Sequence, residues 1–169
     1  MNVIEKFLPE DYFQELKSTV FDKNFLWNFS EVSVYNSQQE LEDLTNYQFS
    51  HVLYENSKPC SKFYENFSIL FGKLNCSVLL RAKINLNVNI GSIKEKPFHT
   101  DIPTFIAKNI NYNTGIFYFD TNNGYTKFKD GTVINTVENR LLYFNGHIPH
   151  CGSSCTDSKK RIVLNINWI

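Results

Sequence analysis

The sequence predicts one α+β domain in which N-terminal helices cover one face of a β-sandwich or barrel. Two features of the chain support this prediction. Up to about residue 74 the apolar residues recur at helical spacing, and from about residue 76 they alternate with polar residues at the period of a strand. A chain of 169 residues, 42% hydrophobic and 15% aromatic, can bury one sizeable core. We therefore expect residues 1–169 to form a single domain, with residues 1–75 as a helical support and residues 76–169 as the β core.

Three helices are expected in the first half of the chain. The first covers "LPEDYFQELKSTVFD", with Pro9 in its first turn and acidic residues near the positive end of the helix dipole. The second would begin at a capping box formed by Ser37 and Glu40, and the third would be capped by Ser61. Their apolar faces, which we expect to be core, consist of Tyr12, Phe13, Leu16 and Val20, then Leu41, Leu44 and Tyr47, then Phe63, Phe67, Leu70 and Leu74.

The second half begins with "LLRAKINLNVNI", in which apolar and polar residues alternate. This alternation predicts a strand with one apolar face, from Leu80 to Val88, and one polar face, from Arg81 to Asn89. Shorter strands are expected at "TGIFYFD", "YTKFKD", "TVINTV", "RLLYFNG" and "RIVLNINWI", separated by the turn signals "TNNG" and "DG".

Composition argues against several classes of function. Seventeen basic and seventeen acidic residues give no net charge, and no run of five like charges occurs, so we expect no binding to bulk nucleic acid or to membranes. The N-terminal stretch carries acidic residues where a signal peptide needs an apolar run. We therefore expect a soluble, cytoplasmic protein, in the host cytoplasm if it is viral.

The four cysteines, Cys60, Cys76, Cys151 and Cys155, include no CxxC pair. In a chain without a secretory signal, free thiols are favoured over disulfides or a zinc site.

Candidate chemistry lies in two loops that contain histidine. The stretch "PFHTDIP" places His99 and Asp101 one residue apart, and "NGHIPHCGSS" carries His147 and His150 just before the final strand. Two imidazoles and one carboxylate could occupy one face of an octahedral metal and leave three positions open, which is the ligand set of non-haem Fe(II) oxygenases. Taken alone, either cluster could equally be hydrogen-bonded loop residues at the surface.

Arg161 adds a third element to this pattern. It is one of only three arginines and lies eleven residues after His150. A strand that returns beside His150 would direct the guanidinium into the same cavity, where a carboxylate ligand would make a buried arginine favourable. The alternative is an exposed charge at the start of a strand, beside Lys159 and Lys160.

The arrangement "HTD … IPHCG … R" resembles that of the Fe(II)- and 2-oxoglutarate-dependent dioxygenases. From "TGIFYFDTNNGYTKFKDG" to the end, the chain is similar to the small members found in phage and marine microbial genomes, which are related in core to prolyl 4-hydroxylases. The resemblance covers residues 76–169 well and the helical half more loosely. It implies a double-stranded β-helix of the jelly-roll or cupin-like type, with N-terminal helices packed on the sheet.

The resemblance also implies roles for individual residues. His99, Asp101 and His150 would bind Fe(II), and Arg161 would bind the cosubstrate 2-oxoglutarate, with O2 as the second cosubstrate. The spacing to Arg161 and the following "CGSS" match the family pattern for His150 rather than for His147. The implied reaction is hydroxylation of a C–H bond, with release of succinate and CO2.

Two polar residues of the first long strand are further candidates for the cosubstrate site. Asn85 and Asn87 could share the distal carboxylate of 2-oxoglutarate with Arg161, or they could be ordinary solvent-exposed strand residues.

Two other functions fit the same residues. A cupin-like isomerase or hydrolase could hold zinc or manganese on the same triad, but it would have no need for Arg161 as a carboxylate anchor. A non-catalytic β-sandwich binding protein would need none of the four residues. The pattern is compatible with several substrates, namely a peptide, an amino acid, a nucleobase or a small metabolite.

Overall fold

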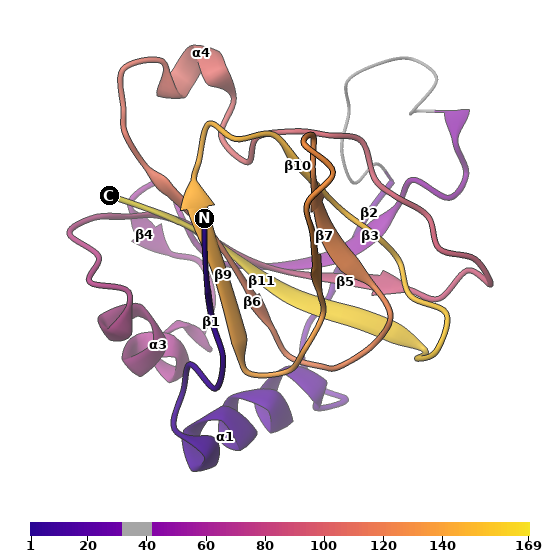
Figure 1. The fold of residues 1–169 in the computed structure, drawn as a ribbon. Helices are drawn as coiled ribbons and strands as arrows, with labels where there is room; N and C mark the ends of the chain where they lie inside the picture. The colour runs from indigo at the N-terminus through magenta and orange to yellow at the C-terminus, as the bar shows by residue number, and fades with distance from the viewer. Residues whose placement is uncertain (32–41) are drawn as a thin grey trace.

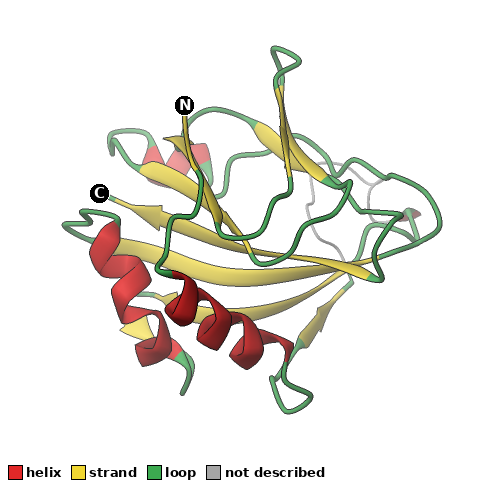
Figure 2. Ribbon diagram, turned by 60° about the horizontal axis from the view of Figure 1, so that its bottom comes forward, coloured by secondary structure: helices red, strands yellow, loops and turns green. Residues whose placement is uncertain are grey.

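Two antiparallel β-sheets pack face to face, and helices cover the outer side of the larger sheet (Figures 1 and 2). The structure, a computed structural model, describes residues 1–31 and 42–169. The larger sheet has eight strands, in the order β1 (Asn2–Ile4), β9 (Arg140–Asn145), β6 (Asn113–Tyr118), β11 (Lys160–Trp168), β5 (Leu79–Val88), β3 (Gln48–Glu55) and β2 (Asn28–Ser30), with β4 (Lys58–Pro59) paired to β3. The smaller sheet has the order β10 (His150–Gly152), β7 (Tyr125–Phe128) and β8 (Val133–Asn135). This architecture confirms the predicted α+β jelly roll.

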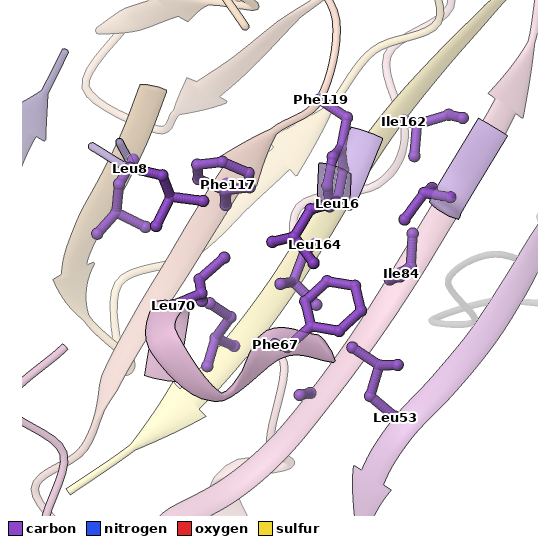
Figure 3. Packing of buried hydrophobic residues seen from close by; sticks show 14 of the residues in the cluster. Leu8, Leu16, Leu53, Phe67, Leu70, Ile84, Phe117, Phe119, Ile162 and Leu164 are labelled. Carbon is purple, nitrogen blue, oxygen red and sulfur yellow. The ribbon is translucent and has the colours of Figure 1, made fainter. Parts of the chain in front are cut away.

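The described helices of the first half of the chain lie on one side of the larger sheet and bury their apolar faces there (Figure 2). Helix α1 (Glu10–Phe21) follows Pro9, and Phe13, Leu16 and Val20 on its inner face are buried, as the sequence spacing predicts. The 3₁₀ helix η1 (Tyr64–Phe67) and helix α3 (Ser68–Lys73) contribute Phe67 and Leu70 to the same core (Figure 3). Within the described residues, no helix is long and apolar enough to cross a bilayer.

Strands β5 and β11 separate this core from the interior of the jelly roll. They pair antiparallel, and their side chains alternate between the two faces. The apolar positions of both strands belong to the core with the helices: Ala82, Ile84 and Leu86 of β5, and Ile162, Leu164 and Ile166 of β11. Figure 3 shows Ile84, Ile162 and Leu164 among them. The other face looks into the space between the two sheets, so the predicted polar face of β5 lines the interior of the jelly roll.

The predicted helical half of the chain also contains strands, which is a correction to the expectation for residues 1–75. Strand β3 pairs with β5 in the centre of the larger sheet, and β1 and β2 form its two edges. The turn from β3 to β4 has positive φ at Asn56 and Ser57, the geometry of a tight hairpin turn. Asn56 is a turn signal in the sequence, and an interpretation based on helical spacing alone overlooks it.

The other two predicted helices differ from expectation as well. The capping box of Ser37 and Glu40 lies outside the described residues, and by Gln48 the chain is already in β3. The third helix is divided into η1 and α3, although Ser61 does act near its start, since its Oγ accepts a hydrogen bond from the backbone N–H of Phe63 at 3.0 Å. Helix α4 (Thr104–Ala107), in the second half of the chain, is a single turn above the jelly roll (Figure 1).

We propose that both halves of the chain unfold as one cooperative unit. Strand β3, from the first half, and strand β5, from the second, are neighbours in one sheet, and the helices have their apolar partners on that sheet. Removing either half would expose the core of the other. A single transition at the same midpoint is therefore expected by circular dichroism and by calorimetry. Two separated transitions would contradict the single-domain proposal.

All four cysteines are free in the structure, with Cys60 exposed, Cys76 partly buried, and Cys151 and Cys155 buried. Their redox state in the cell stays a prediction from the sequence.

Candidate metal and cosubstrate site

Two backbone segments bring His99 and His150 side by side. His150 begins β10, and His99 lies in the loop between β5 and α4. Each residue donates its backbone N–H to the carbonyl of the other at 3.0 Å, which forms an isolated antiparallel bridge. The two imidazole ring centres are 4.9 Å apart, so both side chains lie on the same side of the bridge.

Asp101 completes a group of three potential metal ligands. Its Oδ1 lies 3.6 Å from Nε2 of His99 and 3.8 Å from Nε2 of His150. One ligand atom from each of the three residues lies within 4.8 Å of the others. The carboxylate is almost completely buried, with its side chain 3% exposed. Two imidazole nitrogens and one carboxylate oxygen therefore converge on one point.

Hydrogen bonds to backbone carbonyls select the tautomer of both histidines. Nδ1 of His99 donates to the carbonyl of Pro97 at 2.9 Å, and Nδ1 of His150 donates to the carbonyl of Ile148 at 3.4 Å. A carbonyl oxygen can only accept, so Nδ1 carries the proton in each neutral ring. The lone pair of each ring is consequently on Nε2, the nitrogen that faces Asp101.

Two asparagines of β11 hold the carboxylate of Asp101 in place. Nδ2 of Asn165 donates to Oδ1 at 3.1 Å, and Nδ2 of Asn167 donates to Oδ2 at 3.1 Å. Asn167 also donates to Oγ1 of Thr114 at 3.0 Å, which fixes its own orientation. Hydrogen bonds of this kind position a metal ligand and contribute to affinity.

The pKa values of the three groups reflect burial and their mutual attraction. Burial raises the pKa of Asp101, but the contact with His99, the charges of the imidazoles and the hydrogen bond from Asn167 outweigh it, so the net pKa is below its usual range. Burial lowers the pKa of His99, and the contact with Asp101 more than reverses this effect. For His150 burial prevails and the pKa is lowered. At neutral pH the group thus contains a carboxylate and at least one neutral imidazole.

Arg161, at the start of β11, is buried inside the jelly roll and is 2% exposed. Its Nε donates to Oγ1 of Thr136 at 2.7 Å, Nη2 donates to Oγ1 of Thr126 at 3.3 Å, and Nη1 donates to the carbonyl of Ser153 at 3.4 Å. The guanidinium also lies over the ring of Tyr118, 5.6 Å from its centre. The arginine is therefore an interior group and not the exposed strand-start charge of the alternative interpretation.

No carboxylate of the described residues lies within 4.0 Å of the Arg161 guanidinium. Its protein partners are hydroxyl and carbonyl oxygens, and burial lowers its pKa without abolishing its charge. The guanidinium has five N–H groups, and the three hydrogen bonds use one each on Nε, Nη1 and Nη2. One N–H on Nη1 and one on Nη2 are left for a ligand. A buried permanent cation of this kind favours binding of an anion.

Asn85 and Asn87 lie on the inner face of β5 and line the same cavity as Arg161. Asn87 is the register partner of Arg161, and Asn85 is opposite Val163. The carboxamide oxygen of each is buried without a hydrogen-bond donor. Their amides make no hydrogen bond to the described part of the protein, so their N–H groups are available to a ligand in the cavity. They are not solvent-facing strand residues.

A single cavity of about 420 Å³ joins the two ends of this arrangement. It reaches from the His99, Asp101 and His150 group to Arg161, along the inner faces of β5 and β11. Its lining includes Gln48, Arg81, Lys83, Asn85, Asn87, Lys96, Ile116, Thr126, Gly152, Val163 and Asn165. The three candidate metal ligands thus line one cavity with Arg161, Asn85 and Asn87.

His147 lies away from this group. Its Nε2 is 3.0 Å from the carbonyl of Ile110, and its ring packs edge-on against Tyr112. It is not among the three residues whose ligand atoms converge.

Sequence reasoning missed several residues that shape the site, among them Asn165, Asn167, Thr126 and Thr136. The two asparagines alternate with apolar residues in "VLNINW", and that alternation places them on the inner face of the last strand together with Arg161. The two threonines carried no such signal, because only strand pairing brings β7 and the loop after β8 to Arg161.

Gly124, in the turn before β7, allows Arg161 to lie where it does. A Cβ at this position would be 2.6 Å from Cδ of Arg161 and 2.9 Å from the carbonyl oxygen of Ser154. Such contacts require the arginine or the backbone to move.

We predict that Gly124→Ala displaces the Arg161 guanidinium and weakens its binding of 2-oxoglutarate, the ligand that the sequence resemblance implies for this arginine, by roughly tenfold, which corresponds to about 1.4 kcal/mol. Overpacking also costs stability, about 1–3 kcal/mol. Metal affinity is expected to change little, because the substitution lies at the Arg161 end of the cavity. Isothermal titration with each ligand separates the two effects. Gly72→Ala is a matched control, since no atom lies within 4 Å of its added Cβ. Equal effects of both substitutions would contradict this account of Gly124.

The carboxyl group of Asp120 is buried near the N-terminal end of β11, and burial raises its pKa to about 6. It accepts hydrogen bonds from the backbone N–H of Ile162 at 3.3 Å and from Asn122 at 3.0 Å. When the pKa of an acid is higher in the folded state than in the unfolded state, the folded protein binds the proton more tightly. The protein then loses stability as the pH rises from the unfolded-state pKa, near 4, through the folded-state pKa.

We therefore predict that Asp120→Asn becomes more stable relative to the unmodified protein as the pH rises from 4 to 7. The gain is of the order of 2–3 kcal/mol, since one pKa unit corresponds to about 1.4 kcal/mol. Urea unfolding at several pH values measures it. A stability difference that is independent of pH would show that Asp120 titrates normally.

Comparisons with known proteins bear on the fold. No family model matches the sequence, and no curated protein matches it either. Among solved structures, the chain is similar to a prolyl-4-hydroxylase from Pseudomonas putida, with 14% identity, a TM-score of 0.62 and coverage of 99% of this chain and 90% of that one. It is also similar to an oxidoreductase of the 2OG-Fe(II) oxygenase family from Burkholderia pseudomallei, with 7% identity, a TM-score of 0.67 and coverage of 98% and 84%.

A third similar structure is the viral collagen prolyl hydroxylase from Paramecium Bursaria Chlorella virus-1 in complex with 2OG, with 14% identity, a TM-score of 0.60 and coverage of 99% and 96%. The likeness extends over almost the whole chain in all three cases, including the half where the sequence resemblance was loose. The protein therefore has the fold of the prolyl 4-hydroxylases and related 2-oxoglutarate and Fe(II) oxygenases.

Proposed function

We propose that the protein is an Fe(II)- and 2-oxoglutarate-dependent oxygenase that hydroxylates a C–H bond of its substrate and releases succinate and CO2. One observation carries the proposal: three converging metal-ligand atoms and a buried arginine without a carboxylate partner lie in one cavity. The fold shared with solved oxygenases of this type supports it.

The three ligand residues fit a divalent metal such as Fe(II). They offer two Nε2 lone pairs and one carboxylate oxygen, the donor set of a facial triad, which leaves positions for other ligands. Asn165 and Asn167 keep the carboxylate in place, and the carbonyls of Pro97 and Ile148 keep the rings in the required tautomer. When bound, Fe(II) would supply the activation of O2 that is coupled to decarboxylation of 2-oxoglutarate.

The opposite end of the cavity fits the distal carboxylate of 2-oxoglutarate. Arg161 would donate to it with the two N–H groups that the protein leaves unused, and the amides of Asn85 and Asn87 would donate beside it. The threonines Thr126 and Thr136 position the guanidinium for this contact. Ile116 and Val163 form an apolar part of the wall and limit the access of water.

Anaerobic titration of the protein with Fe(II) and 2-oxoglutarate tests the proposal. A weak charge-transfer band in the visible range is expected only when both are present, because it requires the keto acid to chelate the metal. A cupin-like isomerase or hydrolase would bind the metal without the band, and a non-catalytic binding protein would bind neither. Either outcome would reject the proposal.

A further inference from the structure

Lys83 is a cation of the cavity to which the proposed function assigns no role. It lies on the inner face of β5 and lines the cavity, and no hydrogen bond or ion pair joins its ammonium to the described residues. The two neighbouring cations differ from it. Lys96 donates to the backbone carbonyls of Thr45 and Tyr47 at 3.0 and 3.2 Å, and Arg81 is paired through Nε with Glu55 at 3.1 Å.

The strand register places Lys83 at the metal end of the cavity. It is opposite Asn165, whose amide holds Asp101. Arg161 is opposite Asn87, four residues farther along β5, which is about 13 Å at the rise of a strand. A 2-oxoglutarate carboxylate at Arg161 is therefore too far away to pair with Lys83.

The charge of the cavity stays positive after both cofactors bind. Four cationic side chains and one carboxylate line it: Arg81, Lys83, Lys96, Arg161 and Asp101. A divalent metal and the doubly negative cosubstrate cancel each other. Arg81 already has Glu55, and backbone carbonyls accept hydrogen bonds from Lys96, so Lys83 is the lysine of this cavity whose ammonium has no hydrogen-bond or ion-pair partner among the described residues.

Resting on the proposed function, we infer that the substrate carries an anionic group, a carboxylate or a phosphate monoester, that pairs with Lys83 beside the metal. A buried ammonium without a partner is unfavourable, and an anion of the substrate would give it a charge-assisted hydrogen bond. A neutral substrate would leave the ammonium unpaired. Lys83 would thus select the substrate and orient the carbon next to the anionic group toward the metal.

Two further observations agree with this inference. Burial lowers the pKa of Lys83 to about 8, and Arg81 acts in the same direction while Asp101 and Glu55 oppose it. A second cavity of about 590 Å³ shares Arg81, Asp101 and Pro103 with the first, and its lining includes apolar residues such as Ile106 and Leu80. It offers space for the uncharged body of a substrate whose anionic end is at Lys83.

The test uses the protein loaded anaerobically with Fe(II) and 2-oxoglutarate, with the charge-transfer band recorded first. Two matched pairs of probes are then titrated calorimetrically: butyrate with butyramide, and glycerol 3-phosphate with glycerol. The anionic member of at least one pair is expected to bind about tenfold more tightly than its neutral partner, in line with the strength of a charged hydrogen bond. The pair that shows the preference identifies a carboxylate or a phosphate as the group recognised.

Lys83→Met is expected to remove this preference and to leave the affinity for 2-oxoglutarate within about twofold. Lys108→Met removes the charge of an exposed lysine outside the lining of both cavities, and it is expected to keep the preference.

No preference for the anion in either pair, or a preference that persists in Lys83→Met, would overturn the inference. A tenfold loss of 2-oxoglutarate affinity in Lys83→Met would also overturn it, since Lys83 would then belong to the cosubstrate site. Absence of the band in the unmodified protein would instead reject the proposed function itself.

Discussion

Replacement of Arg161 by methionine is expected to raise the dissociation constant for 2-oxoglutarate at least roughly 100-fold. Removal of one partner from a buried charge pair costs about 3–5 kcal/mol, and 1.4 kcal/mol corresponds to a factor of ten. The affinity for Fe(II) or Mn(II) is expected to change little, because the ligand group lies at the other end of the cavity. Calorimetric titration with metal and then with 2-oxoglutarate measures both quantities, and Arg161→Lys is expected to be intermediate.

Stability measurements distinguish a binding role of Arg161 from a structural one. Without 2-oxoglutarate the guanidinium donates hydrogen bonds to hydroxyl and carbonyl oxygens and lies over the ring of Tyr118, so the methionine variant is expected to lose less than about 1.5 kcal/mol of unfolding free energy. Saturating 2-oxoglutarate is expected to stabilise the unmodified protein and not the variant. Arg140→Met is the matched control, since Arg140 pairs with Glu5 on the outside of the sheet. Unchanged 2-oxoglutarate binding in Arg161→Met would favour a cupin-like metal enzyme.

Replacement of His150 by alanine is expected to reduce metal affinity by more than roughly 100-fold. Substitution of a residue that only supports a ligand costs about 10–100-fold, and His150 supplies a ligand atom itself. The same loss is expected for His99→Ala and Asp101→Ala, because all three ligand atoms converge on one point. Asn165→Ala should fall in the smaller range, since it would only release Oδ1 of Asp101. Titration with Mn(II) in air and with Fe(II) under anaerobic conditions measures these affinities.

His147→Ala is the matched control for His150→Ala. It removes an imidazole three residues away that hydrogen-bonds to the carbonyl of Ile110, so metal affinity is expected to stay within about twofold of the unmodified value. The ring of His150 also packs against Phe144, so His150→Gln, which keeps most of the side-chain volume, guards against a simple loss of folding. An equal loss of affinity in His147→Ala would show that the wrong distal ligand has been chosen.

Local sequence patterns predicted the parts of this protein whose structure depends on near neighbours. The helical spacing of Phe13, Leu16 and Val20 predicted α1 and its buried face, and the alternation after Leu79 predicted β5 with its two faces. The period of a helix or a strand is a property of a short segment, so it can be recognised in the sequence before the fold is known. The same approach failed for β3, because the eight residues Gln48–Glu55 form a strand only through pairing with β5 on one side and β2 and β4 on the other.

The site shows the same division between local and distant information. The sequence by itself determined the candidate residue types: His99 and Asp101 in one loop, a second histidine near residue 150, and an arginine at the start of the last strand. The resemblance favoured His150 over His147, and the structure places His150 beside Asp101. Only the tertiary structure decided that Arg161 is buried without a carboxylate partner among the described residues. The backbone bridge between His99 and His150 and the register of β5 with β11 produce these relations. Both join residues far apart in the chain, and pairing of that kind depends on which strands and loops the fold brings together rather than on any pattern within one segment.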